Sequence, residues 1–167
     1  KFDFSELPAL ITAFAYGPGY GVLVCLLKNA LHLPMSSTQF VGELSNFLMG
    51  AVFVFVAGLF YSIKRTRNCA LIGSLVGNLA MAFACFVVNL FITYPIYMKI
   101  LIPEEAILGM YKAILPAMDS IWKSILVFNV PFTFVKGLVS VGITFLIYRK
   151  ISPLLKAQII LQFLLQV

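Results

Sequence analysis

Long stretches without charge constrain this chain more than any other feature of its sequence. Residues 7–27, 44–63 and 68–98 contain no Asp, Glu, Lys or Arg, and Lys136 is the only charged residue in 124–148. About 20 helical residues cross a hydrocarbon core of ~30 Å, because an α-helix rises ~1.5 Å per residue. Each stretch reaches that length. Since backbone groups in lipid need internal hydrogen-bond partners, the pattern predicts membrane-spanning helices.

Composition supports the same class of protein. The chain is 62% hydrophobic and 11% charged, whereas soluble domains contain about 45–50% apolar and about 25% charged residues. We therefore predict an all-α integral membrane protein with a single transmembrane helical domain over residues 1–156. The remaining residues, 157–167, carry Gln158, Gln162 and Gln166 at helical spacing, which indicates a short amphipathic tail on the membrane surface.

The excess of cations is concentrated in two segments. Residues 64–67 and 149–156 each hold three Lys or Arg residues and no acid, and together they account for the net charge of +6. The positive-inside rule places both segments on the cytoplasmic side of a multi-pass membrane protein. The excess of basic residues therefore indicates how the protein is oriented in the membrane, and it gives no reason to expect nucleic acid as a partner.

The number of spans depends on the segment Gly17-Pro18-Gly19-Tyr20-Gly21, which makes 7–27 either one kinked span or a hairpin of two short helices. The hairpin places the amino terminus outside, and all six carboxylates then share the outer face. On this interpretation there are five helices, at 5–16, 20–33, 43–63, 69–98 and 122–148. Residues 99–121 are expected to form an external loop with a short helix.

Lys136 is expected at the middle of the membrane, because it lies thirteen residues from both Lys123 and Arg149. A charge there costs at least ~2.5 kcal/mol, so its side chain should face a polar partner or a water-filled or ligand-filled cavity. Asn129 and Thr133 share its helix face. Two roles remain open for Lys136: a substrate-binding group, or a structural hydrogen bond to helix carbonyls or a buried amide.

The helix at 69–98 carries polar residues of its own. Asn89, Thr93 and Tyr97 recur at every fourth position, which predicts one polar face that serves either a ligand or a neighbouring helix. For Asn78 we expect the interhelical role. Small residues recur on this helix at a spacing that favours close helix packing: Gly73, Gly77, Ala80 and Ala84.

Catalytic and metal-binding patterns are absent from the sequence. Cys25, Cys69, Cys85 and the single His32 give neither a disulfide framework nor the ligand spacing of a metal site. The phosphate loop G-x-x-x-x-G-K-[ST] and the hydrolase motifs G-x-S-x-G and H-E-x-x-H do not occur. We therefore expect a protein that is not an enzyme, has no cofactor and leaves any ATP hydrolysis to partner subunits.

Several motifs follow one another in a distinctive order over residues 1–156. They are DFSELPAL (3–10), YGPGYG (16–21), LKNALHL (27–33), ST (37–38), VGELSNFLMG (41–50), KRTR (64–67), ALIGSLVG (70–77) and NVPFTFVKG (129–137). In this order they resemble the substrate-binding (S) components of bacterial energy-coupling factor (ECF) vitamin transporters, and among them the riboflavin-specific branch.

The resemblance implies a six-helix protein that captures riboflavin from outside and associates with a transmembrane coupling protein and two cytoplasmic ATPases. The family's first helix has no counterpart in this chain, so we expect that helix to be missing. Five helices with an external amino terminus agree with that expectation.

Riboflavin has a flat tricyclic ring, a polar pyrimidine edge and a chain of hydroxyls. The expected hydrogen-bonding residues are Asn129, Lys136 and Asn89. The expected walls are Phe132, Tyr94, Leu33 and Met35, beneath a covering loop at 33–42. A carrier for folate or thiamine is an alternative, although a negatively charged vitamin would need more than one deep cation. A membrane scaffold without a small ligand is the alternative from a different class.

Overall fold

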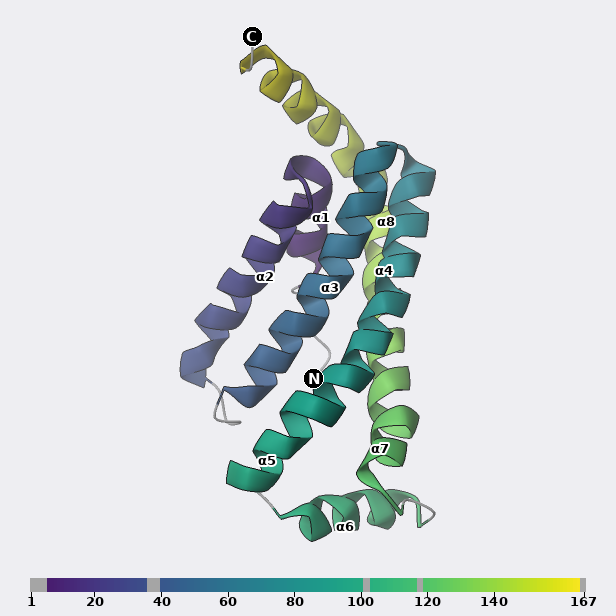
Figure 1. The fold of residues 1–167 in the computed structure, drawn as a ribbon. Helices are drawn as coiled ribbons and strands as arrows, with labels where there is room; N and C mark the ends of the chain where they lie inside the picture. Colours follow the sequence, from purple (N-terminus) through teal and green to yellow (C-terminus); the bar gives the residue numbers. More distant parts are fainter. Residues whose placement is uncertain (1–5, 36–39, 101–102, 117–118, 166–167) are drawn as a thin grey trace.

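The computed structural model describes residues 6–35, 40–100, 103–116 and 119–165, and the side chains in these ranges apart from Met35 and residues 149–165. Every described element is a helix (Figure 1), so the all-α class is confirmed. Three helical stretches are long and apolar enough to cross a membrane: Val41–Ile63, Arg67–Ile100 and Ile121–Tyr148.

The hairpin interpretation of the first charge-free stretch is confirmed. Helix α1 (Glu6–Tyr16) and helix α2 (Pro18–His32) are joined at Gly17, whose φ of 109° strains any residue with a Cβ. Pro18 then starts α2, where its missing N–H breaks no helical hydrogen bond. A Cβ on Gly58 of the next helix would lie 3.0 Å from Pro18, so that helix packs closely against the turn.

Helices α3 (Val41–Ile63) and α4 (Arg67–Val88) pack against each other through glycine. A Cβ on Gly73 would lie 2.7 Å from Phe60 Cβ, and one on Gly77 would lie 2.6 Å from the Phe53 carbonyl oxygen. The predicted close approach at small residues is therefore confirmed at Gly73 and Gly77.

Two of the three long helical stretches each contain one π-helical turn. Helix α4 continues through η2 (Asn89–Thr93) into α5 (Tyr94–Ile100), and α7 (Ile121–Ser124) continues through η3 (Ile125–Asn129) into α8 (Val130–Leu165). Between α5 and α7 lies α6 (Glu104–Ile114), which runs across the end of the bundle (Figure 1), as expected for the loop at 99–121. The side chains of the predicted amphipathic tail, 157–167, fall outside the described residues.

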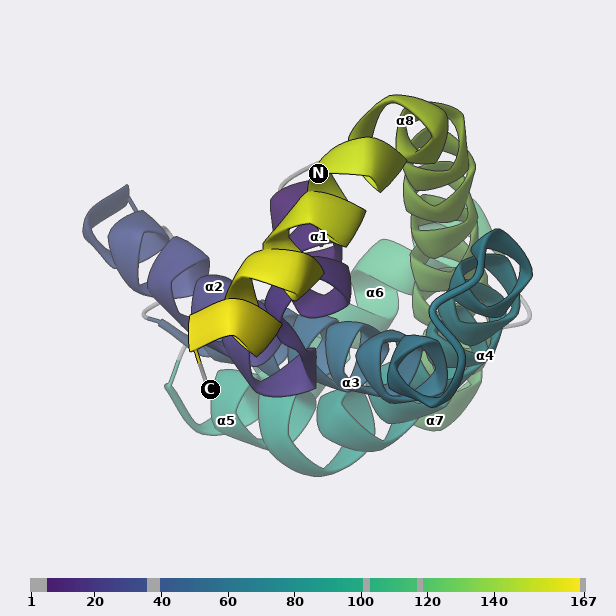
Figure 2. The ribbon, with the colours of Figure 1, turned by 90° about the horizontal axis from the view of Figure 1, so that it is seen from above.

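The bundle has two ends that differ in content (Figure 1). The Gly17 turn and the loop between α3 and α4, with Lys64 and Arg65, lie at one end, which we call the basic end. The opposite end, capped by α6, is the α6 end. Seen from above, α1 lies between α2 and α8 (Figure 2), and it packs against both as well as against α3.

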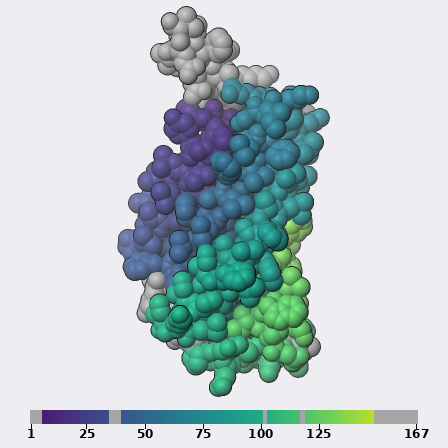
Figure 3. Space-filling model, viewed as in Figure 1, coloured from purple at the N-terminus to yellow at the C-terminus, as the bar shows by residue number. Residues whose placement is uncertain are grey.

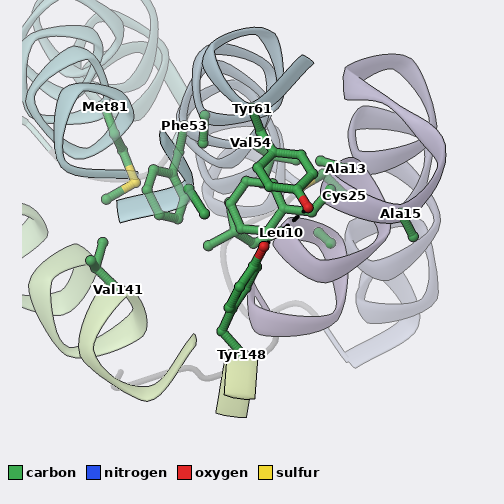
Figure 4. Close-up of a cluster of buried hydrophobic side chains, with 14 residues drawn as sticks. Leu10, Ala13, Ala15, Cys25, Phe53, Val54, Tyr61, Met81, Val141 and Tyr148 are labelled. Atoms are coloured by element: carbon green, nitrogen blue, oxygen red, sulfur yellow. Dashed lines mark hydrogen bonds between the residues drawn. The ribbon is translucent and has the colours of Figure 1, made fainter. Parts of the chain in front are cut away.

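A buried apolar cluster fills the half of the bundle near the basic end (Figure 4). Leu10, Phe53 and Val54 are fully buried at its centre. The hydroxyls of Tyr61 on α3 and Tyr148 on α8 lie 3.1 Å apart and close the cluster. This half is held chiefly by apolar packing.

Candidate functional site

The deepest charge of the bundle is paired with a carboxylate. Lys136 Nζ on α8 lies 2.8 Å from Oε1 of Glu6, the first residue of α1, and the two side chains are only 11% and 3% exposed. Either charge alone at this depth would cost several kcal/mol. The polar partner that Lys136 requires is therefore a carboxylate, and not the carbonyls or buried amide considered from the sequence.

The expectation that all six carboxylates share the outer face is wrong for Glu6, which is buried. Helix α1 has 11 residues and so spans roughly 16 Å, about half of a membrane core. Because α1 ends at the basic end, its first residue lies at mid-depth, level with Lys136. The short length of α1, together with the acid at its start, was the signal that could have identified the partner of Lys136.

One oxygen of Glu6 remains available to a ligand. Among the residues that the structure describes, Glu6 Oε2 is buried and has no hydrogen-bond partner. A Cβ on Gly50 would lie 3.6 Å from Cys25 Sγ and 4.0 Å from Glu6 Oε1, so Gly50 of α3 lies close to both the carboxylate and Cys25 of α2. A buried acceptor without a donor is destabilising. A hydroxyl-bearing ligand would satisfy it.

Asn89 belongs to a second polar group that links α4 to α8. Its Nδ2 donates to the Cys85 carbonyl at 2.7 Å and contacts Cys85 Sγ at 3.2 Å. Cys85 Sγ in turn lies 3.2 Å from Thr133 Oγ1 on α8. All three residues are buried. Asn89 and Thr133 are thus brought together, one turn from Lys136.

Asn89 and Thr93, two members of the predicted polar face, contact different neighbours. Thr93 Oγ1 lies 2.6 Å from Ser45 Oγ on α3, while Asn89 faces the Cys85 and Thr133 side. The cause is the π-helical turn η2, which adds a residue to the turn and rotates the residues that follow it. A spacing of four therefore does not mark one face here.

Asn129, Tyr94 and Tyr111 close a hydrogen-bonded ring. The Tyr111 hydroxyl donates to Asn129 Oδ1 at 3.3 Å, and Asn129 Nδ2 donates to the Tyr94 hydroxyl at 3.1 Å. The two hydroxyls also hydrogen-bond to each other. The structure thus brings the predicted residues Asn129 and Tyr94 together, and Tyr94 contributes a hydroxyl as well as a ring. Tyr111 was missed because it lies in the segment expected to be an external loop.

Two of the remaining predicted wall residues are exposed. Phe132 is 45% exposed on α8, and Leu33, at the end of α2, is 37% exposed. Figures 1 and 2 both place α2, the helix before Leu33, and α8 on opposite sides of the bundle. The side chain of Met35 and most of the predicted covering loop, at 36–39, fall outside the described residues.

Asn78 has the interhelical role that was expected. Its Nδ2 donates to the Phe134 carbonyl of α8 at 3.0 Å. A Cβ on Gly137 would collide with Asn78 Oδ1, so the glycine leaves the space that this amide occupies. Asn78 therefore fastens α4 to α8, and that prediction is confirmed.

A small cavity of about 10 Å³ lies in the half near the basic end. Its lining includes Phe14, Ser74, Val141 and Tyr148. It contains none of the predicted site residues. We therefore assign the candidate site to the polar groups between Glu6 and the ring of Asn129.

The comparisons with known proteins point to one family. A model of the substrate-specific component of ECF transporters matches residues 1–148. The riboflavin transporter RibU of Staphylococcus aureus (strain TCH60) is 30% identical over 154 residues, which cover 92% of this chain and 76% of RibU. The riboflavin transporter FmnP of Bacillus subtilis (strain 168) is 30% identical over 164 residues, or 95% of this chain and 80% of FmnP.

The fold leads to the same family. A solved structure of the S component of a bacterial ECF transporter matches with a TM-score of 0.69 and 31% sequence identity, covering 92% of this chain and 79% of that chain. The chain therefore belongs to the family of substrate-specific components of ECF transporters.

Proposed function

We propose that this chain binds riboflavin and serves as the substrate-capture subunit for its uptake across the bacterial cell membrane. The observation that carries the proposal is the row of buried or half-buried polar groups on the η3–α8 helix: Asn129, Thr133 and Lys136, the last paired with Glu6. Ionisable groups at membrane depth are costly and usually mark a substrate path. The relatives RibU and FmnP are both riboflavin transporters.

The polar groups match the chemistry of riboflavin. Amides such as those of Asn129 and Asn89 suit the pyrimidine edge, which presents both donors and acceptors. Glu6 Oε2 suits the ribityl hydroxyls, since it is an acceptor without a donor among the described residues. Lys136 and Glu6 neutralise each other, so an uncharged ligand fits better than an anionic one. Tyr94, Phe132, Leu33 and Met35 remain the proposed walls.

The substrate site is proposed to face the outside of the cell. The basic loop Lys64–Arg67 lies at the same end as Tyr148, the residue before the second basic segment. The positive-inside rule assigns that end to the cytoplasm. The ring of Asn129 then lies in the outer half, beneath α6.

The energy for uptake is proposed to come from partners. As an S component the chain would associate with a transmembrane coupling protein and two cytoplasmic ATPase subunits. The sequence supports ATP hydrolysis by the partner subunits, because it contains no phosphate-binding loop motif.

The proposal is tested on the purified full chain in detergent. Copurified flavin would give yellow, fluorescent protein, and the ligand-free protein should quench riboflavin fluorescence until one flavin is bound per chain. Thiamine and folate, added in excess, should not compete. Colourless protein that quenches no flavin would contradict the proposal, and competition by thiamine or folate would reassign the vitamin.

A further inference from the structure

Helix α6 is weakly anchored for an element that covers one end of the bundle. Ile107 is the one residue of Glu104–Ile114 that is buried, and Met110 and Ile114 are each 67% exposed. A Cβ on Gly109 would meet nothing within 4 Å. In the space-filling view, the green segment that includes α6 forms the lower end of the molecule (Figure 3). Three of its eleven residues, Ile107, Leu108 and Tyr111, pack in the apolar cluster at this end.

The hydroxyl of Tyr111 supplies a polar anchor for this helix. It hydrogen-bonds to Tyr94, the residue directly after η2, and to Asn129, the last residue of η3. The Tyr111 ring also lies 5.5 Å from the Phe128 ring. A single hydroxyl thus ties α6 to the ends of both π-helical turns.

The ring leaves Asn129 able to bind a ligand at the same time. A primary amide has two N–H donors and an oxygen with two lone pairs. Tyr94 uses one donor and Tyr111 uses one lone pair. Among the described residues, nothing uses the second N–H or the second lone pair of Asn129, so both remain for substrate. Hydrogen bonds in a connected network strengthen one another. Ligand bound to Asn129 should therefore tighten the hold of Tyr111 on α6.

We propose that Tyr111 is a positioning residue that couples occupancy of Asn129 to the seating of α6, so that α6 retains the bound substrate. The inference rests on the proposed function for the identity of the ligand. Tyr111 acts through Asn129 and slows release. Loss of the hydrogen bonds of Tyr111 should raise the dissociation rate of the ligand roughly tenfold, which corresponds to about one net hydrogen bond.

The first test compares Tyr111→Phe with Tyr97→Phe by stopped-flow flavin fluorescence on the full chain. Tyr97 packs in the same apolar cluster, but its hydroxyl is outside the ring. Tyr111→Phe should raise the riboflavin dissociation rate about tenfold and change the association rate less than about twofold, whereas Tyr97→Phe should leave both near wild type. A merely structural role would lower the fraction of binding-competent protein and leave its dissociation rate unchanged, which would overturn the inference.

The second test needs no assumption about the ligand. Hydrogen exchange of the backbone amides in 104–114 is measured without ligand, with α3 as internal reference. In this ligand-free measurement, Tyr111→Phe should speed exchange in 104–114 and leave α3 unchanged. In a separate measurement, riboflavin should slow exchange in the wild type. Faster exchange in a protein that binds no flavin would refute the proposed function and support the anchor. Wild-type exchange in Tyr111→Phe would overturn the inference even if flavin binds.

Discussion

The half of the bundle near the basic end packs apolar side chains against glycines, whereas the half near α6 is crossed by hydrogen bonds between amides and hydroxyls. In the first, Phe53 is fully buried and Gly77 leaves no room for a methyl group. In the second, Asn89 and Asn129 bond to neighbours that a ligand could supplement or replace. Close packing specifies one shape. Exchangeable hydrogen bonds can instead accommodate an empty and an occupied state.

The largest effect is expected where the two halves meet. Lys136→Met leaves Glu6 buried without its partner, which should cost about 3–5 kcal/mol of unfolding free energy and abolish most riboflavin affinity. The double variant Glu6→Gln/Lys136→Met removes both charges and should regain most of the stability but not the affinity. Thermal unfolding and flavin titration measure the two quantities. A single variant as stable as wild type, or a double variant that binds as wild type does, would contradict this assignment.

The next effect should fall on stability alone. Gly77→Ala pushes a methyl group against the Phe53 carbonyl and forces α3 and α4 apart, with a loss of about 1–3 kcal/mol in unfolding free energy. The riboflavin dissociation constant of the folded fraction should stay within about twofold. Gly109→Ala is the matched control, because its Cβ meets nothing within 4 Å. A large change in affinity for Gly77→Ala would show that the halves are coupled.

Two amides allow a direct comparison of binding with packing. Asn129→Leu should weaken riboflavin binding at least about tenfold, ~1.4 kcal/mol, and change stability little, because the hydroxyls of Tyr94 and Tyr111 can still pair. Asn78→Leu should do the opposite, because it removes the hydrogen bond to the Phe134 carbonyl. Isothermal titration and denaturant unfolding of both variants distinguish the roles. If both variants lost the same riboflavin affinity, the distinction between a binding amide and a packing amide would be wrong.

The smallest effect is expected at the basic end. Tyr61→Phe removes one hydroxyl of the pair with Tyr148, which should cost about 0.5–1.5 kcal/mol without altering flavin affinity. Tyr148→Phe should match it, and the double variant should lose less than the sum of the two. Fully additive losses in unfolding free energy would show that the two hydroxyls do not interact.

Sequence reasoning located the elements because membrane helices follow from local patterns. The charge-free stretches predicted the long helices, and Gly17 and Pro18 predicted the hairpin. The site was only partly predictable, because its geometry depends on contacts between distant segments. Glu6 and Lys136 are 130 positions apart, and Tyr111 reaches Asn129 from a different helix. The π-helical turn at 89–93 also displaced a polar face that regular helix spacing had predicted.

The paired π-helical turns have a consequence for how such a protein can diversify. One extra residue in a turn shifts the angular phase of everything beyond it by about 100°. The α4–α5 and α7–α8 helices each carry that shift on the α6 side of the glycine contacts at Gly77 and Gly137. Mutations beyond the shift can therefore change which side chains point inward without disturbing the glycine contacts on the other side. The chain can in this way vary its ligand chemistry while conserving its scaffold.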